Sequence, residues 1–194
     1  MPELPVRAEP DFQLVLVCTA NQIRSPIAEA LVLRFAGALP LATRSLGLRD
    51  LGPKSPPAAA IQAAADLGLD ISTHRSRRLE PGSLRESDAV VGFEPVHVAA
   101  AVLDERAFLL RELVELLEQV DASSESDPAE RARLAVARAH ARRRALPVQN
   151  IAASLDDPHG RGRSAYRSAV RELGELVPRL VDGLFRQART ANRG

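Results

Sequence analysis

The chain has 194 residues, of which 45% are hydrophobic and 26% are charged, and its net charge is +1. This length allows one large domain or two small ones with a substantial core. The near-neutral charge argues against a general nucleic-acid binder. The apolar runs are too short to cross a membrane, and the first residues lack the apolar stretch of a secretory signal. We therefore expect a cytoplasmic protein without nucleic-acid or membrane partners.

Cysteine usage restricts the chemistry further. The only cysteine is Cys18. A single cysteine excludes an intrachain disulfide, a thiolate zinc cluster and a cysteine-ligated iron–sulfur site. Two interpretations remain: an inert buried thiol, or a lone nucleophile in a reducing compartment. The four histidines are scattered along the chain, so we predict no metal site and no cofactor.

The first part of the chain begins with a strand pattern and continues with a helix pattern. Residues 14–17 are continuously apolar, which predicts a strand buried on both faces and favours a parallel sheet. Apolar spacing predicts a helix over 26–36, with Ser25 as its N-cap and Gly37 after its end. The following segments are predicted to be a strand over 41–46, a loop over 47–57, a helix over 56–67 and an irregular segment over 71–83.

The second part continues this alternation and contains one segment of different character. Residues 121–144 begin acidic and turn-like and continue as an Ala/Arg-rich helix. We expect an insertion at about 121–148 that packs lightly on the main domain. We expect the charged face of this helix to be exposed to solvent. The alternative is that it forms a docking site for an acidic partner. The other predicted elements are a strand over 88–93, a helix over 94–103, a short strand over 107–110, a helix over 111–120, a strand or its loop over 151–155 and an amphipathic helix over 164–186.

Alternating strands and helices predict an α/β fold. We expect a single three-layer domain over 1–194, with a central parallel sheet of about four strands and helices on both faces. Ligands of such sheets bind at the carboxyl ends of the strands. Because Cys18 follows the first predicted strand, it lies at such an end.

The segment from Cys18 to Ser25, CTANQIRS, has the spacing of an anion-binding loop. Five residues between a strand and a helix can wrap around a tetrahedral oxyanion, so that backbone N–H groups and the helix N-terminus face it. Arg24 adds a planar fork that matches two phosphate oxygens. The same positive potential favours the thiolate of Cys18, and Ser25 can donate its hydroxyl to the sulfur. This pattern predicts a phosphate loop after the first strand.

At this point the sequence resembles the low-molecular-weight protein tyrosine phosphatases. VCTANQIRSPIAEALV is similar to their N-terminal signature, and further similar segments are TRSLGL, LGLDISTHRSRRL, ESDAVVGF, FLLRELVEL and LDDPHG. The resemblance covers about 12–120 and 151–184. It implies a protein-tyrosine phosphatase in which Cys18 forms a phosphocysteine and Arg24 stabilises the phosphoryl group. Asp157, followed by Pro158, then matches the general acid.

The resemblance also assigns supporting residues. The loop residues that would bind the substrate phosphate are Thr19, Ala20, Asn21, Gln22, Ile23 and Ser25. Ser45 and His74 match positions that hold the loop by hydrogen bonds, as does Asn21. The neighbouring Asp156 is read as a solvated loop residue.

Three departures from the family pattern matter, and the third spans two positions. Ala20 replaces a glycine, which costs roughly 1 kcal/mol if the backbone there needs a positive φ. Ile23 replaces a second cysteine, so reversal of Cys18 oxidation would need an external thiol. His159 and Gly160 stand where aromatic residues often line the cleft. His159 is either a substrate contact or an exposed loop residue.

The substrate of a phosphatase would be a phosphotyrosine protein or another aryl phosphate. Two other hypotheses stay open at this stage. An arsenate reductase could use the same anion loop with an external small thiol. A non-catalytic phosphoprotein-binding module would use the loop for recognition alone.

Overall fold

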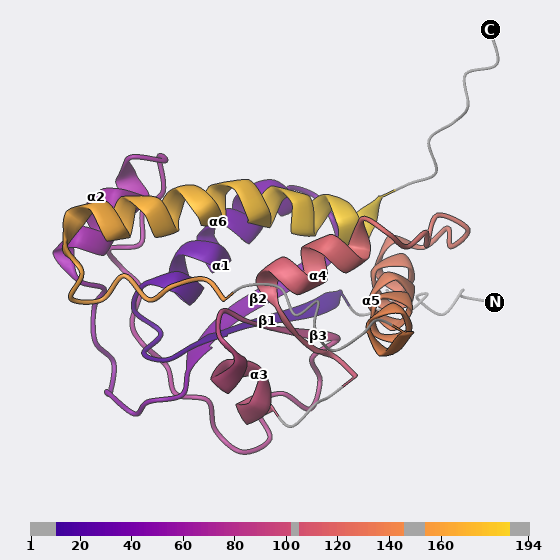
Figure 1. Cartoon of the computed structure of the whole chain (residues 1–194), viewed down its shortest axis with the longest axis horizontal. Helices are drawn as coiled ribbons and strands as arrows, with labels where there is room; N and C mark the ends of the chain where they lie inside the picture. The colour runs from indigo at the N-terminus through magenta and orange to yellow at the C-terminus, as the bar shows by residue number, and fades with distance from the viewer. Residues whose placement is uncertain (1–10, 102–104, 146–153, 187–194) are drawn as a thin grey trace, which may run out of the picture.

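The computed structural model describes residues 11–101, 105–145 and 154–186. Its centre is a four-stranded sheet in the order β2-β1-β3-β4, and every strand pair is parallel (Figure 1). The strands are β1 (Phe12–Cys18), β2 (Leu41–Gly47), β3 (Ala89–Gly92) and β4 (Ala107–Leu109). The predicted parallel α/β fold is therefore confirmed.

Strand β1 lies in the middle of the sheet and ends at the cysteine. It pairs with β2 over its whole length, from Phe12 opposite Leu41 to Cys18 opposite Gly47, and with β3 on its other side. Its side chains alternate between the two faces, because successive residues of a strand point in opposite directions. Both faces are covered, so the strand reads as an almost continuous apolar run.

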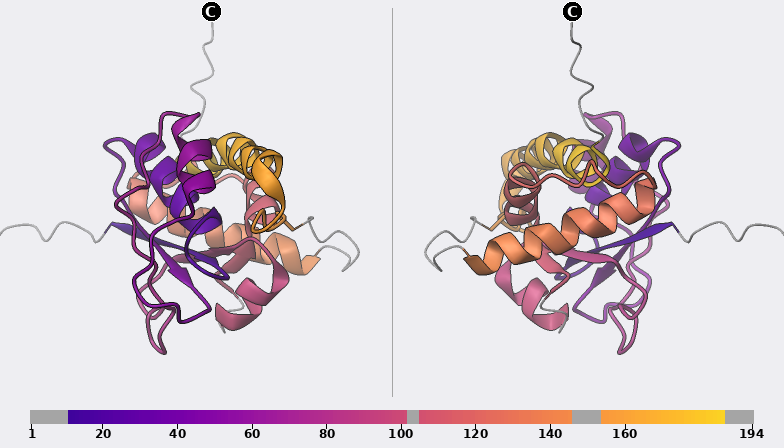
Figure 2. Two further views of the ribbon diagram at one scale, coloured as in Figure 1. Left: turned by 90° about the vertical axis from the view of Figure 1, so that its left-hand side faces the viewer. Right: turned by 90° about the vertical axis from the view of Figure 1, so that its right-hand side faces the viewer.

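Helices cover the two faces of the sheet unequally, and together they make three layers (Figure 2). One face packs against α1 (Arg24–Ala36), α4 (Leu110–Leu117) and α6 (Gly162–Phe185), with α2 (Ala58–Ala65) beside α6. The other face packs against α3 (Pro95–Ala101) and the loop that contains Leu79 and Leu84. This arrangement leaves the carboxyl ends of β1 and β2 free to form a site.

Helix α5 (Pro128–Ala145) corrects one expectation from the sequence. We expected the helical segment within 121–148 to pack lightly, but Ala132 and Ala139 are fully buried in the main core. The small alanine side chains allow α5 to approach α4, α6 and β1 closely. Arg133 binds Asp88 at 3.0 Å, just before β3, so α5 lies at the amino ends of the strands. This end is opposite the one that carries Cys18.

Two local predictions also differ from the structure. Helix α1 begins at Arg24, so Ser25 lies inside the helix and makes no cap hydrogen bond, while Ile23 occupies the N-cap position. The Ser25 hydroxyl instead contacts the cysteine sulfur. Of the segment predicted as a strand or its loop, residues 154–155 form a loop, and residues 151–153 lie outside the described residues.

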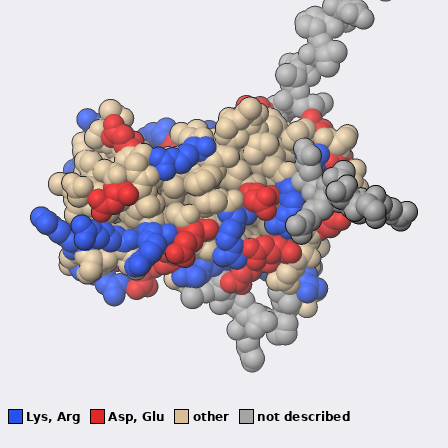
Figure 3. Space-filling view, turned by 90° about the horizontal axis from the view of Figure 1, so that it is seen from above, with Lys and Arg blue, Asp and Glu red and all other residues tan. Residues whose placement is uncertain are grey.

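The surface carries charges of both signs. In the view from above, basic side chains gather along one edge with acidic ones beside them, and much of the remaining face is uncharged (Figure 3). Exposed ion pairs such as Arg161–Asp156 and Arg179–Glu118 contribute to this mixture. Pairs of this kind stabilise a fold by only about 0–1 kcal/mol. In the described ranges, no helix is both long enough and apolar enough to cross a membrane.

Candidate active site

Cys18 lies at the base of the predicted anion-binding loop, at the carboxyl end of β1. Its side chain is buried, and its Sγ accepts hydrogen bonds from the Asn21 backbone N–H at 3.2 Å and the Ser25 hydroxyl at 3.0 Å. Within the described part of the chain, no group accepts a hydrogen bond from the backbone N–H groups of Thr19, Ala20, Gln22 and Ile23. Together with the N-terminus of α1, these donors make the loop suited to bind an oxyanion.

Asn21 determines the shape of this loop. Its φ is 51°, and it is the only non-glycine residue in the described ranges with a positive φ. Its fully buried side chain donates to Ser25 Oγ at 2.9 Å and Ser45 Oγ at 2.8 Å, and it accepts from the Arg77 backbone N–H at 2.8 Å. The strained backbone thus falls on Asn21 rather than on Ala20. Asparagine tolerates this region better than most residues, so the conformational cost expected at Ala20 does not arise.

The structure brings Ser45 and His74 to Asn21. His74 Nε2 lies 2.9 Å from the Asn21 carbonyl and 3.2 Å from Asn21 Oδ1, and both acceptors require a proton on this nitrogen. Burial lowers the pKa of His74. Ser45 donates to Glu29 Oε2, so a carboxylate that the sequence analysis did not identify completes the network.

Gly47 allows the end of β2 to approach the loop. A Cβ atom at this position would lie 2.9 Å from the backbone carbon of Ala20 and 2.9 Å from the backbone nitrogen of Asn21. Backbone atoms cannot move aside like the end of a flexible side chain. The glycine is therefore required by close packing beside the loop.

Arg24 extends from the first turn of α1 and is almost completely buried, with 1% exposure. Its Nη1 donates to Glu94 Oε2 at 2.7 Å and to the Leu155 carbonyl at 2.9 Å, while its Nη2 donates to Asp157 Oδ2 at 2.7 Å. The guanidinium also lies over the Phe93 ring, 5.9 Å from its centroid. These contacts compensate the burial of the charge and fix the orientation of the guanidinium.

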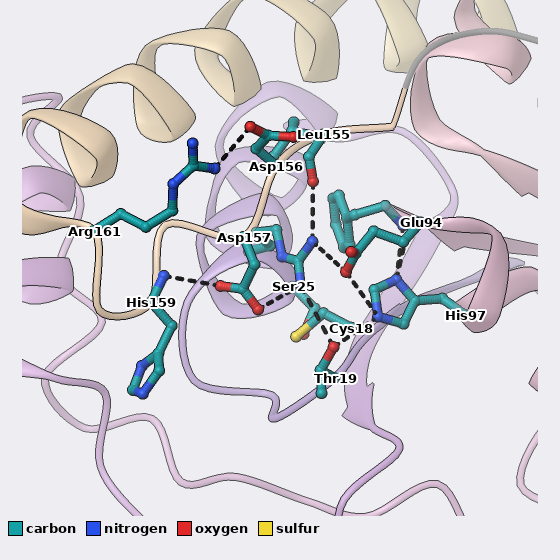
Figure 4. Close-up of polar contacts among 12 residues, drawn as sticks. Cys18, Thr19, Ser25, Glu94, His97, Leu155, Asp156, Asp157, His159 and Arg161 are labelled. Atoms are coloured by element: carbon teal, nitrogen blue, oxygen red, sulfur yellow. Dashed lines mark hydrogen bonds and ion pairs between the residues drawn. The ribbon is translucent and has the colours of Figure 1, made fainter.

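The two adjacent aspartates have different environments (Figure 4). Asp157 faces the cysteine loop and is 37% exposed, whereas Asp156 pairs with Arg161 at 2.8 Å on the outside and is 79% exposed. The His159 backbone N–H donates to Asp157 Oδ1 at 3.0 Å, but the His159 ring points away from Cys18 in Figure 4. Asp157 is therefore the aspartate that pairs with Arg24 beside the cysteine loop, while Asp156 faces outward and the backbone of His159 supports Asp157.

The remaining loop residues contact the surrounding structure. Gln22 Nε2 donates to the Ser55 carbonyl at 2.9 Å, which ties the loop to the segment after β2. Ile23 is buried in the main core. Their side chains therefore secure the loop, and only their backbone N–H groups are available to an anion.

Sequence reasoning missed two residues of this site, Glu94 and His97. Glu94 immediately precedes α3 and His97 lies in its first turn. Glu94 pairs with Arg24, and His97 Nε2 lies 3.0 Å from Thr19 Oγ1. The only signal was their position just after the carboxyl end of β3, where ligands of parallel sheets bind. Across the described ranges, no group of three or more His, Cys, Asp or Glu side chains has the arrangement of a metal site.

Comparisons with known proteins agree with this geometry. Two curated relatives are low molecular weight protein-tyrosine-phosphatases: Wzb of Salmonella typhi is 35% identical over 45% of this chain, and Etp of Escherichia coli K12 is 32% identical over 44%. The matched parts cover only 58% and 57% of these relatives.

Solved structures extend the likeness to most of the fold. A YwlE mutant from Bacillus subtilis has a TM-score of 0.65 at 21% identity, and the match covers 90% of this chain and 99% of that chain. Wzb from Escherichia coli K30, in complex with sulphate, has a TM-score of 0.62 at 18% identity, covering 89% and 97%. The family model described as low molecular weight phosphotyrosine protein phosphatase matches residues 13–132, more than half of the sequence. The chain therefore belongs to the low molecular weight phosphotyrosine protein phosphatase family.

Proposed function

We propose that this protein hydrolyses phosphomonoesters, with phosphotyrosine in proteins or a similar aryl phosphate as its substrate. The observation that carries the proposal is the arrangement around Cys18. Its sulfur receives two hydrogen bonds at the base of a loop with free N–H donors, and Asp157 and Arg24 face each other beside it. A nucleophile, an anion site and an acid thus occur together.

In the first step, the Cys18 thiolate attacks phosphorus in line with the phenolic oxygen. The S–P bond forms while the P–O bond to the leaving group breaks. The N–H groups of the loop and the Arg24 guanidinium stabilise the equatorial oxygens in the transition state. Asp157 donates a proton to the leaving oxygen, which an aryl alcohol with a pKa near 10 requires at neutral pH.

In the second step, the phosphocysteine is hydrolysed. The Asp157 carboxylate, left without its proton, removes a proton from water, and the resulting hydroxide attacks phosphorus. The S–P bond breaks, which releases inorganic phosphate and restores the Cys18 thiolate. The hydrogen bonds from Asn21 and Ser25 stabilise the sulfur as it takes up negative charge.

The names of similar proteins support the reaction and broaden the substrates to be tested. Relatives are named protein-tyrosine-phosphatases, whereas the fold neighbour from Geobacillus stearothermophilus is named an arginine phosphatase. Another YwlE structure is that of a cysteine-to-serine mutant with a phosphorylated active site serine. The segments beside this site, 48–57 and 156–160, contain no Phe, Tyr or Trp to stack on a phenol ring. Phosphotyrosine preference therefore needs a direct test against phosphoarginine.

The deciding experiment is turnover of a panel of phosphopeptides by the purified chain. Matched peptides carry phosphotyrosine, phosphoserine or phosphoarginine, and phosphate release is measured with wild type and Cys18→Ser. We expect the fastest release from phosphotyrosine and none with Cys18→Ser. Tight binding without turnover by wild type would instead indicate a binding module. Thiol-dependent formation of arsenite from arsenate, without phosphate release, would indicate a reductase.

The single cysteine adds a redox consequence to the proposed function. A sulfenic acid formed at Cys18 has no second cysteine in the sequence with which to form a disulfide. We expect peroxide to inactivate the enzyme and an added small thiol to restore it. The proposed activity accordingly requires a reducing compartment, such as the cytoplasm.

A further inference from the structure

His97 is a buried histidine that the proposed reaction does not use. Its side chain has 0% exposure, and its Nδ1 accepts hydrogen bonds from the backbone N–H groups of Phe93 at 3.2 Å and Glu94 at 3.0 Å. An imidazole nitrogen that accepts two N–H donors carries no proton of its own. The ring proton of neutral His97 therefore resides on Nε2.

The Nε2–H group of His97 points to the residue after the nucleophile. Nε2 lies 3.0 Å from Thr19 Oγ1, so His97 donates and Thr19 accepts. Arg24 Nη2 donates a longer hydrogen bond, 3.5 Å, to the same oxygen. The Thr19 hydroxyl oxygen thus accepts hydrogen bonds from two donors. The hydroxyl proton of Thr19 is therefore directed away from His97 and Arg24. Thr19 is only half-buried, beside the sulfur of Cys18 (Figure 4).

We propose that His97 is a positioning residue that turns the Thr19 hydroxyl proton toward the phosphoryl group of the substrate. Thr19 then supplies a side-chain donor to a non-bridging phosphoryl oxygen, in addition to the N–H groups of the loop. His97 acts only through Thr19, because its Nδ1 is engaged by the backbone and its ring is buried. This inference rests on the proposed phosphatase function and gives specific roles to the His97 ring and the Thr19 hydroxyl.

The charged groups around the ring are compatible with this role. Arg24, Glu94 and Asp157 face His97, and Glu94 Oε2 lies 3.6 Å from its Nε2. Burial, together with the positive charge of Arg24, lowers the pKa of His97 to about 4. The ring is therefore neutral at neutral pH, the state in which Nδ1 accepts and Nε2 donates. Its direction of donation is thus constant over the pH range in which a phosphatase would work.

Two substitutions of His97 separate its two hydrogen-bonding functions. In His97→Asn, the amide oxygen can replace Nδ1 as the acceptor for the backbone N–H groups, but nothing reaches Thr19. In His97→Gln, the amide nitrogen can replace Nε2 as the donor to Thr19, but the Nδ1 acceptor is lost. We expect roughly a tenfold lower kcat for His97→Asn with little loss of thermal stability. For His97→Gln we expect the reverse: kcat closer to wild type and a lower melting temperature.

Thr19 provides the matched controls. Thr19→Val removes the hydroxyl at nearly constant volume, and Thr19→Ser keeps it. We expect Thr19→Val to lower kcat as His97→Asn does, and Thr19→Ser to lower kcat less than Thr19→Val, because serine retains the hydroxyl. Adding His97→Asn to Thr19→Val should cause no further loss, because the two residues act in series. Additive losses, or full activity of either Thr19→Val or folded His97→Asn, would overturn the proposal.

A measurement on wild type keeps the proposal testable if His97→Asn fails to fold. Imidazole ¹⁵N NMR at neutral pH should show a neutral ring protonated at Nε2, with a slowly exchanging proton that becomes fast-exchanging in Thr19→Val. A proton on Nδ1 of His97, or an unchanged exchange rate of the Nε2 proton in Thr19→Val, would contradict the proposal. Failure of the proposed function is distinguishable, because wild type itself would then release no phosphate.

Discussion

The guanidinium of Arg24 and the carboxylate of Asp157 form an ion pair of 2.7 Å beside the cysteine loop. The two residues are 133 positions apart in the chain, and the carboxyl end of the sheet brings them together. In the proposed mechanism, one binds the phosphoryl oxygens and the other protonates the leaving group. Binding of the substrate must therefore exchange Asp157 for a phosphoryl oxygen at Arg24 Nη2.

Removing the carboxylate should slow the chemical step. For Asp157→Ala we expect kcat on an aryl phosphate to fall roughly 10²–10⁴-fold, because general acid catalysis contributes about that much. The loss should be smaller for substrates whose leaving groups need no proton. Steady-state kinetics on a series of aryl phosphates measures both effects. Asp156→Ala is the matched control, and its kcat should stay near wild type. Equal loss in the two variants would remove Asp157 from the role of acid.

The same substitution should strengthen the binding of phosphate. Without Asp157, Arg24 Nη2 loses its competing carboxylate, and the negative charge that repels the anion is gone. We expect the inhibition constant of inorganic phosphate to decrease in Asp157→Ala, while Asp156→Ala leaves it unchanged. Competitive inhibition at constant ionic strength, or calorimetry, measures this constant. Weaker binding in Asp157→Ala would show that the ion pair does not oppose the ligand.

The spacing of residues in the sequence predicts only the part of the site that is local in the chain, whereas Ser45, His74 and Asp157 follow from the family resemblance. Cys18, Arg24 and Ser25 lie within one strand–loop–helix segment, so their spacing alone indicates an anion loop. Glu94 and His97 carry no comparable pattern, because their contacts to Arg24 and Thr19 depend on how β3 and α3 pack beside β1. The burial of the His97 side chain likewise depends on tertiary packing and has no signal in the sequence.

Helix α5 is a second case in which the sequence does not predict tertiary packing. Its Ala/Arg composition is typical of an exposed helix, yet one row of its alanines lies in the core, namely Ala129, Ala132, Ala135 and Ala139. Two of its arginines bind groups nearby: Arg131 donates to the Glu125 carbonyl and Arg133 to the Asp88 carboxylate. Composition indicates that a helix forms, but it does not reveal how closely small side chains allow neighbours to approach. The N-cap prediction at Ser25 was wrong for a related reason, since the hydroxyl is needed by Cys18.

Asn21 offers a test of how the loop keeps its shape. Asn21→Gly retains access to positive φ but loses the side-chain hydrogen bonds, whereas Asn21→Ala loses both. We expect both variants to be destabilised by about 2–4 kcal/mol in urea unfolding, with Asn21→Ala the less stable. Both should lose activity, because the loop donors are no longer held together. Equal stability of the two variants would show that backbone strain at this position is negligible.

The close packing of α5 predicts a position-specific response to added volume. Ala139 has 0% exposure, so Ala139→Leu should overpack the core and lower the free energy of unfolding by about 1–3 kcal/mol. Ala141 is exposed on the same helix, and Ala141→Leu should change that free energy little. Chemical denaturation compares the two variants. The folded Ala139→Leu protein should keep its kcat, because α5 lies at the end of the sheet opposite Cys18. Tolerance of leucine at both positions would mean that α5 packs as loosely as its composition suggests.

Buried His97 predicts how stability depends on pH. Its pKa is about 4 in the folded protein, against an ordinary value of 6.5. Above pH 6.5 the ring is neutral in both states and its contribution to stability is complete. As the pH falls from 6.5 to 4, the unfolded chain takes up the proton first, so stability decreases.

The full decrease attributable to His97 is about 3 kcal/mol, since each pKa unit corresponds to about 1.4 kcal/mol. The lowered pKa of His74 acts in the same direction, so some dependence on pH should remain without His97. Urea unfolding of wild type and His97→Asn at intervals between pH 4 and pH 7.5 measures the difference. The variant should lose most of the slope in this window, because asparagine does not titrate. An unchanged slope would mean that His97 accepts a proton in the folded protein as readily as in the unfolded chain.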